Sequence, residues 1–376
     1  MKILISGYYG FGNVGDEAVL QGAIDGLQDI APGSHISVLS LDPDKTKHNF
    51  HVDAIPRNDF FTVLRAISHS DVFISGGGTL FQDSTSIRSV LYYLFLMQMA
   101  LWMRKKVVVF AQGFGPIRSS ITHYLLQTVL RRVHLILLRD PKALHEMEKS
   151  GISGPPIHVT GDPAFLLKPA AKNEIAKLLE REGIVLDGRP IAAICVRKLV
   201  RTQSLAEQEQ MRVALAKTAD YLVTERGMRV VFVNFQPRTD VEEAIRILNL
   251  MTHTADVILR EYLPSELLGF LGEAHLVIGM RLHALIFASS MGTPFIGLSY
   301  DPKVSGFVEQ MEQVWMDAGT LDAVRLLSSV QKILSERNSM SLALNAKREE
   351  MIRNAKKNFE ELDTFFKHVA SKNITS

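Results

Sequence analysis

Cysteine is almost absent from this sequence, and its scarcity excludes two kinds of site. The one cysteine, Cys195, lies in the apolar run Ile191–Val196. A single thiol forms no internal disulfide and cannot build a zinc site from cysteines. Because its neighbours are apolar, we expect an inert buried thiol and no catalytic nucleophile. Clustered histidines or carboxylates are missing as well, so we expect no metal and no cofactor.

An excess of charge of either sign is also missing. With 42 Lys and Arg against 40 Asp and Glu, the formal net charge is +2. Nucleic-acid binding normally calls for a concentrated basic face, so no nucleic-acid partner is expected. The 376 residues, 47% apolar and 22% charged, are typical of a globular chain. At about 100–200 residues per domain, they indicate two domains.

Apolar runs long enough to cross a membrane are lacking too. Val90–Met103 is apolar except for Gln98 and is followed by three basic residues, but a membrane span needs about 20 residues. We expect a helix packed on a sheet; the alternative is that residues 90–106 touch an anionic membrane surface. The N-terminus reads as a first strand and not a signal peptide. We therefore expect a cytoplasmic protein, with the inner face of the membrane as the alternative site.

What the sequence does contain is an alternation of short apolar runs with helical stretches. Unbroken apolar runs separated by helices are typical of buried parallel strands. The expected strands are Lys2–Ser6, Ile36–Leu41, Val72–Ser75, Lys106–Ala111, Leu135–Leu138, Ile157–Thr160, Ile191–Val196, Val230–Asn234, Val257–Leu259, Leu276–Ile278 and Phe295–Leu298. The expected helices are 16–30, 59–69, 87–104, 120–132, 140–150, 205–226, 239–252, 264–273 and 283–292.

A pause at Lys168–Lys172 divides this alternation and predicts an α/β protein of two Rossmann-like domains. The predicted domains are 1–168 and 173–335, with a helical tail, 336–376, that packs back on the first. Two such domains facing a cleft make a glycosyltransferase-B-like architecture. In parallel sheets ligands bind beyond the carboxyl ends of the strands, so the turns there are the candidate sites.

Glycine-rich turns follow three strands of the first half. Residues 7–17 contain a formal dinucleotide motif, but the loop is long and its acidic helix start would repel a pyrophosphate. We expect Asn13 and Asp16 to bond a hydroxyl-bearing ligand; the alternative is helix capping. Gly77 and Gly78, within three consecutive glycines, expose backbone amides to the same ligand. Residues 113–116 form a similar opening.

Cationic side chains follow three other strands. Arg281 and His283 come directly after a strand and before a helix, where free amides and the helix dipole favour anions. If the turn is extended, both point the same way while Leu282 points to the core. Arg281 is suited to a phosphate or carboxylate, and His283 to a general acid that gains its proton once an anion is bound. Arg139 has either an anionic ligand, which we favour, or a carboxylate partner, and Lys303 either faces the ligand or is solvated.

These motifs together resemble the polysaccharide pyruvyl transferase family, of the type acting on bacterial secondary cell-wall polymers. The matching runs, spread over most of the chain, are residues 7–18, 75–83, 113–116, 139–140, 161–165, 279–288 and 299–304. The resemblance implies transfer from phosphoenolpyruvate to two hydroxyls of one sugar, giving a 4,6-ketal and phosphate. It implies β-N-acetylmannosamine in a glycan, expected to be lipid-linked, as the acceptor.

The resemblance also assigns residues. Arg281 and His283 match the family's R-L-H motif, and the other donor-binding charges fall on Arg139 and Lys303. After the first strand of the second domain, where relatives often carry an arginine followed by a proline and an aromatic residue, this chain has Arg197-Lys198-Leu199, which leaves the role of Arg197 open.

Two other functions compete with this one. A nucleotide-sugar glycosyltransferase often has a glutamate that binds the donor ribose five residues before a G-x-P turn. Here the turn is Gly292–Pro294 and Phe287 occupies that position. A non-catalytic sugar-binding protein is the second competitor, but it would not need a paired arginine and histidine at a strand end.

Overall fold

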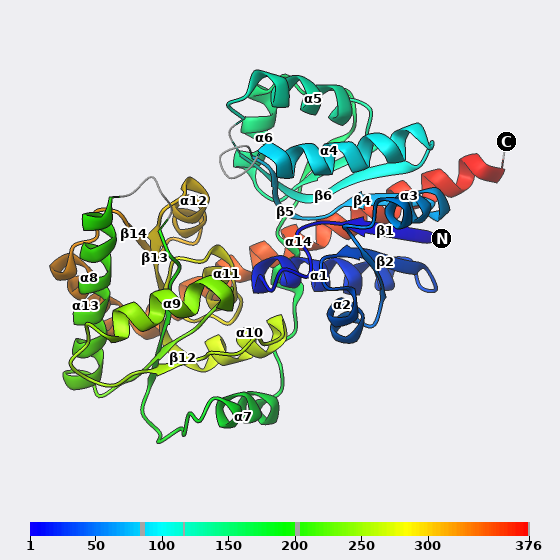
Figure 1. The fold of residues 1–376 in the computed structure, drawn as a ribbon. Coiled ribbons are helices and arrows are strands. Elements are labelled where there is room, and N and C mark those ends of the chain that lie inside the picture. The colour runs from blue at the N-terminus through cyan, green and yellow to red at the C-terminus, as the bar shows by residue number, and fades with distance from the viewer. Residues whose placement is uncertain (83–86, 116, 200–203, 375–376) are drawn as a thin grey trace. The chain divides into compact units, whose positions relative to one another are not determined.

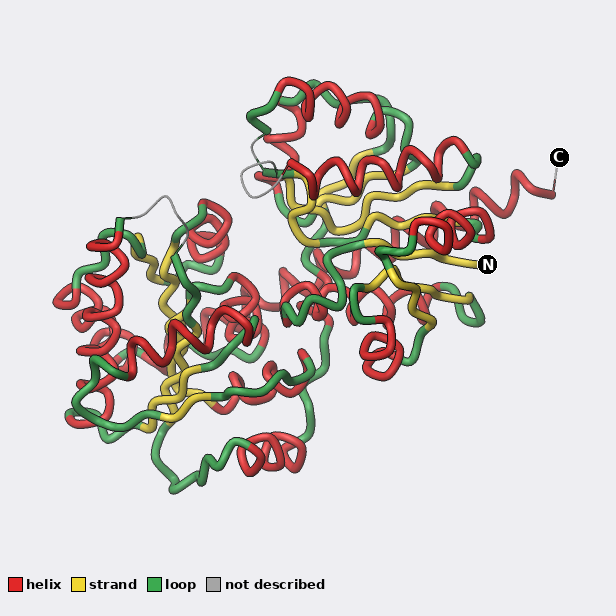
Figure 2. Tube along the Cα trace, viewed as in Figure 1, coloured by secondary structure: helices red, strands yellow, loops and turns green. Residues whose placement is uncertain are grey.

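The computed structural model describes residues 1–82, 87–115, 117–199 and 204–374. They form two compact units, one of residues 1–167 and 351–376 and one of residues 168–350. Each unit is a parallel sheet with helices packed against it (Figures 1 and 2). The predicted class, α/β with two Rossmann-like domains, is confirmed.

The first unit is built on a sheet of eight strands in the order β3-β2-β1-β4-β6-β7-β8, with β5 beside β6. These strands are β1 Lys2–Ser6, β2 His35–Ser40, β3 Asp53–Pro56, β4 Val72–Ser75, β5 Gly78–Phe81, β6 Lys106–Phe114, β7 Leu135–Leu138 and β8 Ile157–Val159. The helices are α1 Val14–Ile30, α2 Pro43–Phe50, α3 Phe60–His69, α4 Ile87–Trp102, α5 Ser120–Leu130, α6 Pro141–Lys149 and the 3-10 turn η1 Pro163–Leu166.

Apolar side chains cover both faces of this sheet. Successive residues of a strand point to opposite faces. Leu4 therefore packs into a core with α3, α4, α5 and α6, while Ile3 and Ile5 pack into another with α1. Each core is closed by a helix layer, as the doubly wound arrangement requires.

The second unit has a six-stranded sheet in the order β11-β10-β9-β12-β13-β14. The strands are β9 Ile191–Cys195, β10 Arg229–Phe232, β11 Asp256–Val257, β12 Ala274–Gly279, β13 Phe295–Ser299 and β14 Val314–Asp317. The helices are α7 Lys172–Arg181, α8 Leu205–Thr224, α9 Pro237–Leu248, α10 Pro264–Glu273, α11 Leu282–Ser290, α12 Pro302–Gln310, α13 Ala323–Ser335 and α14 Arg337–Ile374.

Helix α14 belongs to both units, which differs from the expected tail. Its residues up to Glu350 group with the second unit and those from Met351 with the first. Within the first unit the Asn358 side chain, fully buried, donates to the Gly161 carbonyl at 2.8 Å and accepts from the Thr160 hydroxyl at 2.7 Å. The Phe359 ring lies 5.6 Å from that of Phe110.

Candidate functional site

The carboxyl edge of the second sheet gathers most of the predicted donor-site residues. Strand β12 lies between β9 and β13, with Gly279 beside both Cys195 and Gly297. The turns that follow these three strands carry Arg197, then Arg281 with His283, then Lys303. Because the strands are parallel and adjacent, their turns emerge at the same edge.

Three helices also begin at this edge, namely α9, α11 and α12. They follow strands β10, β12 and β13 in turn, so the N-terminus of each helix, with the positive end of its dipole, lies at the carboxyl edge of the sheet. The amides of a helix's first turn point outward from that end. This edge therefore combines cationic side chains with the backbone geometry that binds anions.

Arg281 is held by the buried carboxylate of Asp240, which was not among the predicted site residues. Its Nε donates to Asp240 Oδ2 at 3.0 Å, and Nη2 donates to Asp240 Oδ1. Nη2 also reaches Gln236 Oε1 at 3.2 Å and Thr239 Oγ1 at 3.3 Å. Asp240 is fully buried and accepts from the backbone amides of Phe235 and Gln236. An anion that binds Arg281 must therefore share the guanidinium with Asp240.

One feature of the sequence points to Asp240 as a possible site residue. Asp240 lies in the first turn of α9, directly beyond β10, which neighbours β9 in the sheet. A carboxylate at the strand edge that carries Arg281 is its natural partner. What the sequence does not give is the strand order that brings residue 240 beside residue 281.

His283 lies at the second position of α11, two residues after Arg281, which is the N-cap of that helix. The expected extended turn is wrong, because the helix begins at Leu282. Leu282 is only half-buried, and Met280 is the fully buried side chain of this segment. His283 is half-buried at the edge where an anion would bind. Its role as a general acid remains a prediction.

Lys303 lies in the first turn of α12 and has a carboxylate partner. Its Nζ is 3.6 Å from Asp301 Oδ2, and both side chains are about 30% exposed. Asp301 also caps the helix by accepting from the Lys303 amide at 3.0 Å. A half-exposed pair of this kind is weak and exchanges readily with solvent or a ligand.

Arg197 is the residue whose role the sequence left open. Its Nη1 donates to the Tyr300 hydroxyl at 2.6 Å, and the guanidinium lies 4.4 Å from the Tyr300 ring centroid. Within the described ranges Arg197 makes no ion pair with a carboxylate, which distinguishes it from Arg281 and Lys303. A half-buried cation oriented by an aromatic ring and balanced by no carboxylate is well suited to an anionic ligand.

The first glycine-rich turn is occupied by internal contacts. Gly10 and Gly12 have φ of 77° and 72°, in the left-handed region that favours glycine. The Gly10 amide donates to Glu17 Oε1 at 2.7 Å, so a carboxylate already takes an amide that a pyrophosphate would use. The pKa of Glu17 is raised to about 7, chiefly by burial; the hydrogen bond from the Gly10 amide lowers it and the charge of Asp16 raises it. This arrangement argues against a dinucleotide.

Of the four predicted acceptor residues, Asp16 and Gly78 lie close to each other. A Cβ added to Gly78 would lie 3.0 Å from Asp16 Oδ1, and Gly78 has φ of 104°. Asn13 instead caps α1, its side chain accepting from the Gly15 amide at 3.1 Å. Gly77 is explained by packing, because a Cβ there would lie 2.5 Å from Val19 Cγ1.

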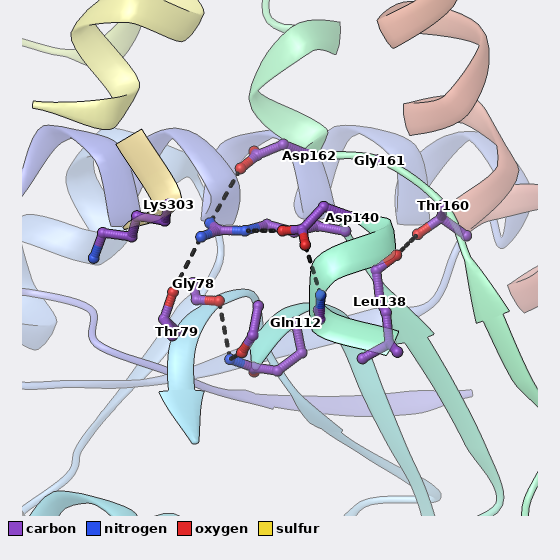
Figure 3. A network of polar contacts seen from close by, with 12 residues as sticks. Gly78, Thr79, Gln112, Leu138, Asp140, Thr160, Gly161, Asp162 and Lys303 are labelled. Atoms are coloured by element: carbon purple, nitrogen blue, oxygen red, sulfur yellow. Dashed lines mark hydrogen bonds and ion pairs between the residues drawn. The ribbon is translucent and has the colours of Figure 1, made fainter. Parts of the chain in front are cut away.

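Arg139 has structural partners, which is the alternative that we did not favour (Figure 3). Its side chain, 7% exposed, lies 3.4 Å from Asp162 Oδ2 and 3.5 Å from Asp140 Oδ2. Nη2 donates to Thr79 Oγ1 at 3.0 Å. Asp162 and Asp140 also cap η1 and α6. These contacts account for Arg139 without a ligand, and a donor-binding role for it stays a prediction.

The sequence also predicts an inert cysteine, no metal site and no membrane-spanning helix, and the structure bears on each of these features. Burial raises the pKa of the Cys195 thiol, so it stays protonated. The described residues contain no group of three or more histidine, cysteine, aspartate or glutamate side chains that could hold a metal ion. None of the helices, over the part of the chain described, is long and apolar enough to span a bilayer.

The chain is similar to several known proteins. It is 24% identical over 363 residues to the amylovoran biosynthesis protein AmsJ of Erwinia amylovora, covering 83% of this chain and 86% of AmsJ. Anabaena HepE, solved with UDP-glucose, is 13% identical with a TM-score of 0.64, covering 99% of this chain and 100% of HepE. UDP-GlcNAc 2-epimerase of Neisseria meningitidis is 13% identical with a TM-score of 0.65, covering 96% and 99%. At this identity the solved structures show the fold alone.

The family relationship comes from the sequence. The model of the polysaccharide pyruvyl transferase family matches residues 13–302, which include Arg139, Arg197, Arg281 and His283 and stop one residue before Lys303. The match covers far more than half of the 376 residues. The chain therefore belongs to the polysaccharide pyruvyl transferase family, which supports a transferase that moves pyruvyl groups onto polysaccharide.

Proposed function

We propose that the chain transfers the enolpyruvyl unit of phosphoenolpyruvate onto two hydroxyls of one sugar, forming a 4,6-ketal and releasing phosphate. We further propose β-N-acetylmannosamine, within a lipid-linked cell-wall glycan precursor, as the acceptor. Family membership supports the pyruvyl transfer. The choice of donor and acceptor is supported by the resemblance of the motifs, residues 279–288 and 299–304 above all.

One observation carries the choice of donor. Arg197, Arg281 and Lys303 follow three adjacent strands, at an edge where three helices begin. Phosphoenolpyruvate has a phosphate and a carboxylate, so it needs several positive groups within a few ångströms of one another. Charge that develops on the departing phosphate is stabilised by the same groups, which is usually the largest catalytic contribution.

The proposed reaction uses His283 as the acid. His283 gives a proton to the methylene carbon, forming a C–H bond and leaving an oxocarbenium-like C2. One sugar hydroxyl then forms a C–O bond to C2, the bond from C2 to the phosphate oxygen breaks, and the second hydroxyl takes its place. Of the two hydroxyl protons, one restores His283 and the other leaves on phosphate. No metal or cofactor takes part.

The acceptor is assigned to the first unit, as the sequence predicts. Asp16, beside Gly78, offers a carboxylate that can accept hydrogen bonds from sugar hydroxyls. Asn13 and Gly77 then serve the site indirectly. Asn13 caps α1, and Gly77, having no side chain, allows the backbone before β5 to lie against Val19.

A nucleotide-sugar glycosyltransferase is the second candidate, because HepE was solved with UDP-glucose and shares the fold. Phe287, at the position of the expected glutamate, is fully buried and its ring lies 5.4 Å from that of Phe235. A ring in the core cannot bond a ribose hydroxyl. This observation favours the pyruvyl transferase.

The experiment mixes the protein with phosphoenolpyruvate and a synthetic β-N-acetylmannosaminide, and follows phosphate release and the acceptor mass. We expect both to change together, with no loss in EDTA and no turnover by His283→Ala. Turnover of UDP-sugars without phosphate release from phosphoenolpyruvate would establish the glycosyltransferase. Binding of the glycan without turnover of either donor would instead indicate a sugar-binding protein.

A further inference from the structure

Three neighbouring helices in one layer of the first unit, α3, α4 and α5, contain no acidic residue. From Ile87 to Arg139 the chain has eight basic residues and no aspartate or glutamate, although the whole chain has 40 acidic residues in 376. This stretch includes α4 and α5, and α3, on the same face of the sheet, has Arg65 and no acidic residue either. On the opposite face α1 is acidic and α14 carries charges of both signs. Helix α6, beside α5 in the sequence, carries Glu146 and Glu148, so the surface with basic but no acidic residues is that of α3, α4 and α5.

The same layer exposes large apolar side chains. Phe61 is 81% exposed, Trp102 is 64% exposed and Ile121 is 72% exposed. We call the surface formed by these three residues with Phe60, Phe95 and Tyr124 the α3–α5 face. The side chains from different helices are joined: the rings of Phe60 and Phe95 stack at 6.1 Å. Gln98 Oε1 accepts from Trp102 Nε1 at 2.9 Å and from Arg132 Nη1 at 3.2 Å.

Helix α4 shows how unusual this surface is. One side of it, including Tyr93, Leu94 and Met97, is buried on the sheet, while Phe95 and Trp102 on the other side are exposed. A surface helix of a globular protein normally has polar residues on its outer side. At 16 residues α4 is too short to cross a bilayer, so an apolar outer side fits a surface contact.

We propose that the α3–α5 face docks on an anionic lipid bilayer. Aromatic side chains with polar atoms, such as Trp102 and Tyr124, settle at the headgroup level, and basic residues around them attract anionic lipids. A second copy of the chain is a poorer occupant. A twofold interface would place the basic residues of one copy against those of the other. This proposal is independent of the donor and acceptor assigned above.

The test is sedimentation of the full chain with vesicles of phosphatidylcholine, with or without one third phosphatidylglycerol. We expect binding to the mixed vesicles, weakened by salt, and little binding to phosphatidylcholine alone. Phe61→Asp and the pair Arg65→Glu with Arg88→Glu should each weaken binding about tenfold or more. None of these residues belongs to the proposed catalytic or substrate-binding groups, so phosphate release with a soluble acceptor should be unchanged.

Matched controls lie in the second unit. Val324→Asp alters a similarly exposed apolar residue, at 74%, and Lys217→Glu with Arg226→Glu makes the same change of net charge. These variants should bind vesicles as the unaltered chain does. Equal losses in both sets, or no binding by the unaltered chain, would overturn the proposal. A dimer in ultracentrifugation that Phe61→Asp abolishes would assign the face to a second copy instead.

Discussion

At the scale of single residues, Asp240 balances the positive charge of Arg281 and so weakens the attraction between Arg281 and an anionic ligand. Its carboxylate is fully buried and holds two nitrogens of the guanidinium. Asp240→Asn removes the balancing charge and should lower the free energy of unfolding by about 3 kcal/mol. If the proposed donor phosphoenolpyruvate binds Arg281, it supplies the missing negative charge and should raise the melting temperature of this variant more than that of the unaltered chain, as measured by calorimetry.

The control for this prediction lies on the same helix. Glu243 is buried and pairs with Arg212 of α8, with Arg212 Nε 2.7 Å from Glu243 Oε1. Glu243→Gln should also destabilise the chain, but phosphoenolpyruvate should give it no additional stabilisation. If both variants respond to phosphoenolpyruvate as the unaltered chain does, Arg281 does not contact the donor.

Glu17 is predicted to make stability depend on pH. Burial raises its pKa from 4.5 to about 7, so the folded chain holds the proton between these values while the unfolded chain has lost it. Its contribution to stability is therefore full below pH 4.5 and falls as the pH rises to about 7. Glu17→Gln keeps a neutral acceptor for the Gly10 amide. It should stabilise the fold at pH 8 by on the order of 1 kcal/mol or more, and much less at pH 4.5.

Urea titrations at the two pH values measure this difference. Asp29→Asn, on the exposed side of the same helix α1, serves as the control and should change stability by less than about 0.5 kcal/mol at either pH. A pH-independent effect of Glu17→Gln would mean that the carboxyl is ionised throughout this range.

At the scale of elements, the second half of α14 is fitted to the loop before η1. A Cβ on Gly161 would lie 2.6 Å from the Ala355 amide nitrogen, so the helix could not keep its position. Gly161→Ala should therefore destabilise the first unit by roughly 1–3 kcal/mol in urea unfolding. Gly306→Ala, in α12, has no atom within 4 Å of the added Cβ. That variant should be neutral or more stable, by up to about 1 kcal/mol.

The elements also show what the sequence could and could not predict. Most buried strands were predictable because their apolar runs are continuous. Strand β3, Asp53–Pro56, and the preceding α2 were missed because one is short and half-exposed and the other is mostly polar. The turn after β12 was predicted in place but not in conformation, since the helix starts one residue early.

The sequence also did not predict which carboxylates pair with the candidate arginines. Arg139 and Arg281 were recognised as candidate anion-binding residues at strand ends. Their carboxylate partners, Asp162 and Asp240, lie 23 and 41 residues away in the chain. Only the strand order brings such residues together, and hydrophobic periodicity predicts strands without their order.

At the scale of the whole molecule, donor and acceptor are assigned to different units, and this can be tested without catalysis. Hydrogen exchange measures the opening of backbone amides along the chain. Phosphoenolpyruvate alone should slow exchange at the starts of α9, α11 and α12 in the second unit. The soluble β-N-acetylmannosaminide alone should slow exchange in residues 7–17 and 76–79 of the first.

Arg139 makes this experiment decisive for the site. It lies in the first unit, and its contacts with Asp162, Asp140 and Thr79 explain its position without a ligand. If phosphoenolpyruvate leaves exchange in residues 139–143 unchanged, the arginine is structural, and the donor site consists of Arg197, Arg281, His283 and Lys303. If it slows exchange there as well as at α11, Arg139 contacts the donor, and the assignment of the first unit to the acceptor alone is wrong. Histidine variants cannot separate these cases, because His283→Ala is expected to abolish turnover in both.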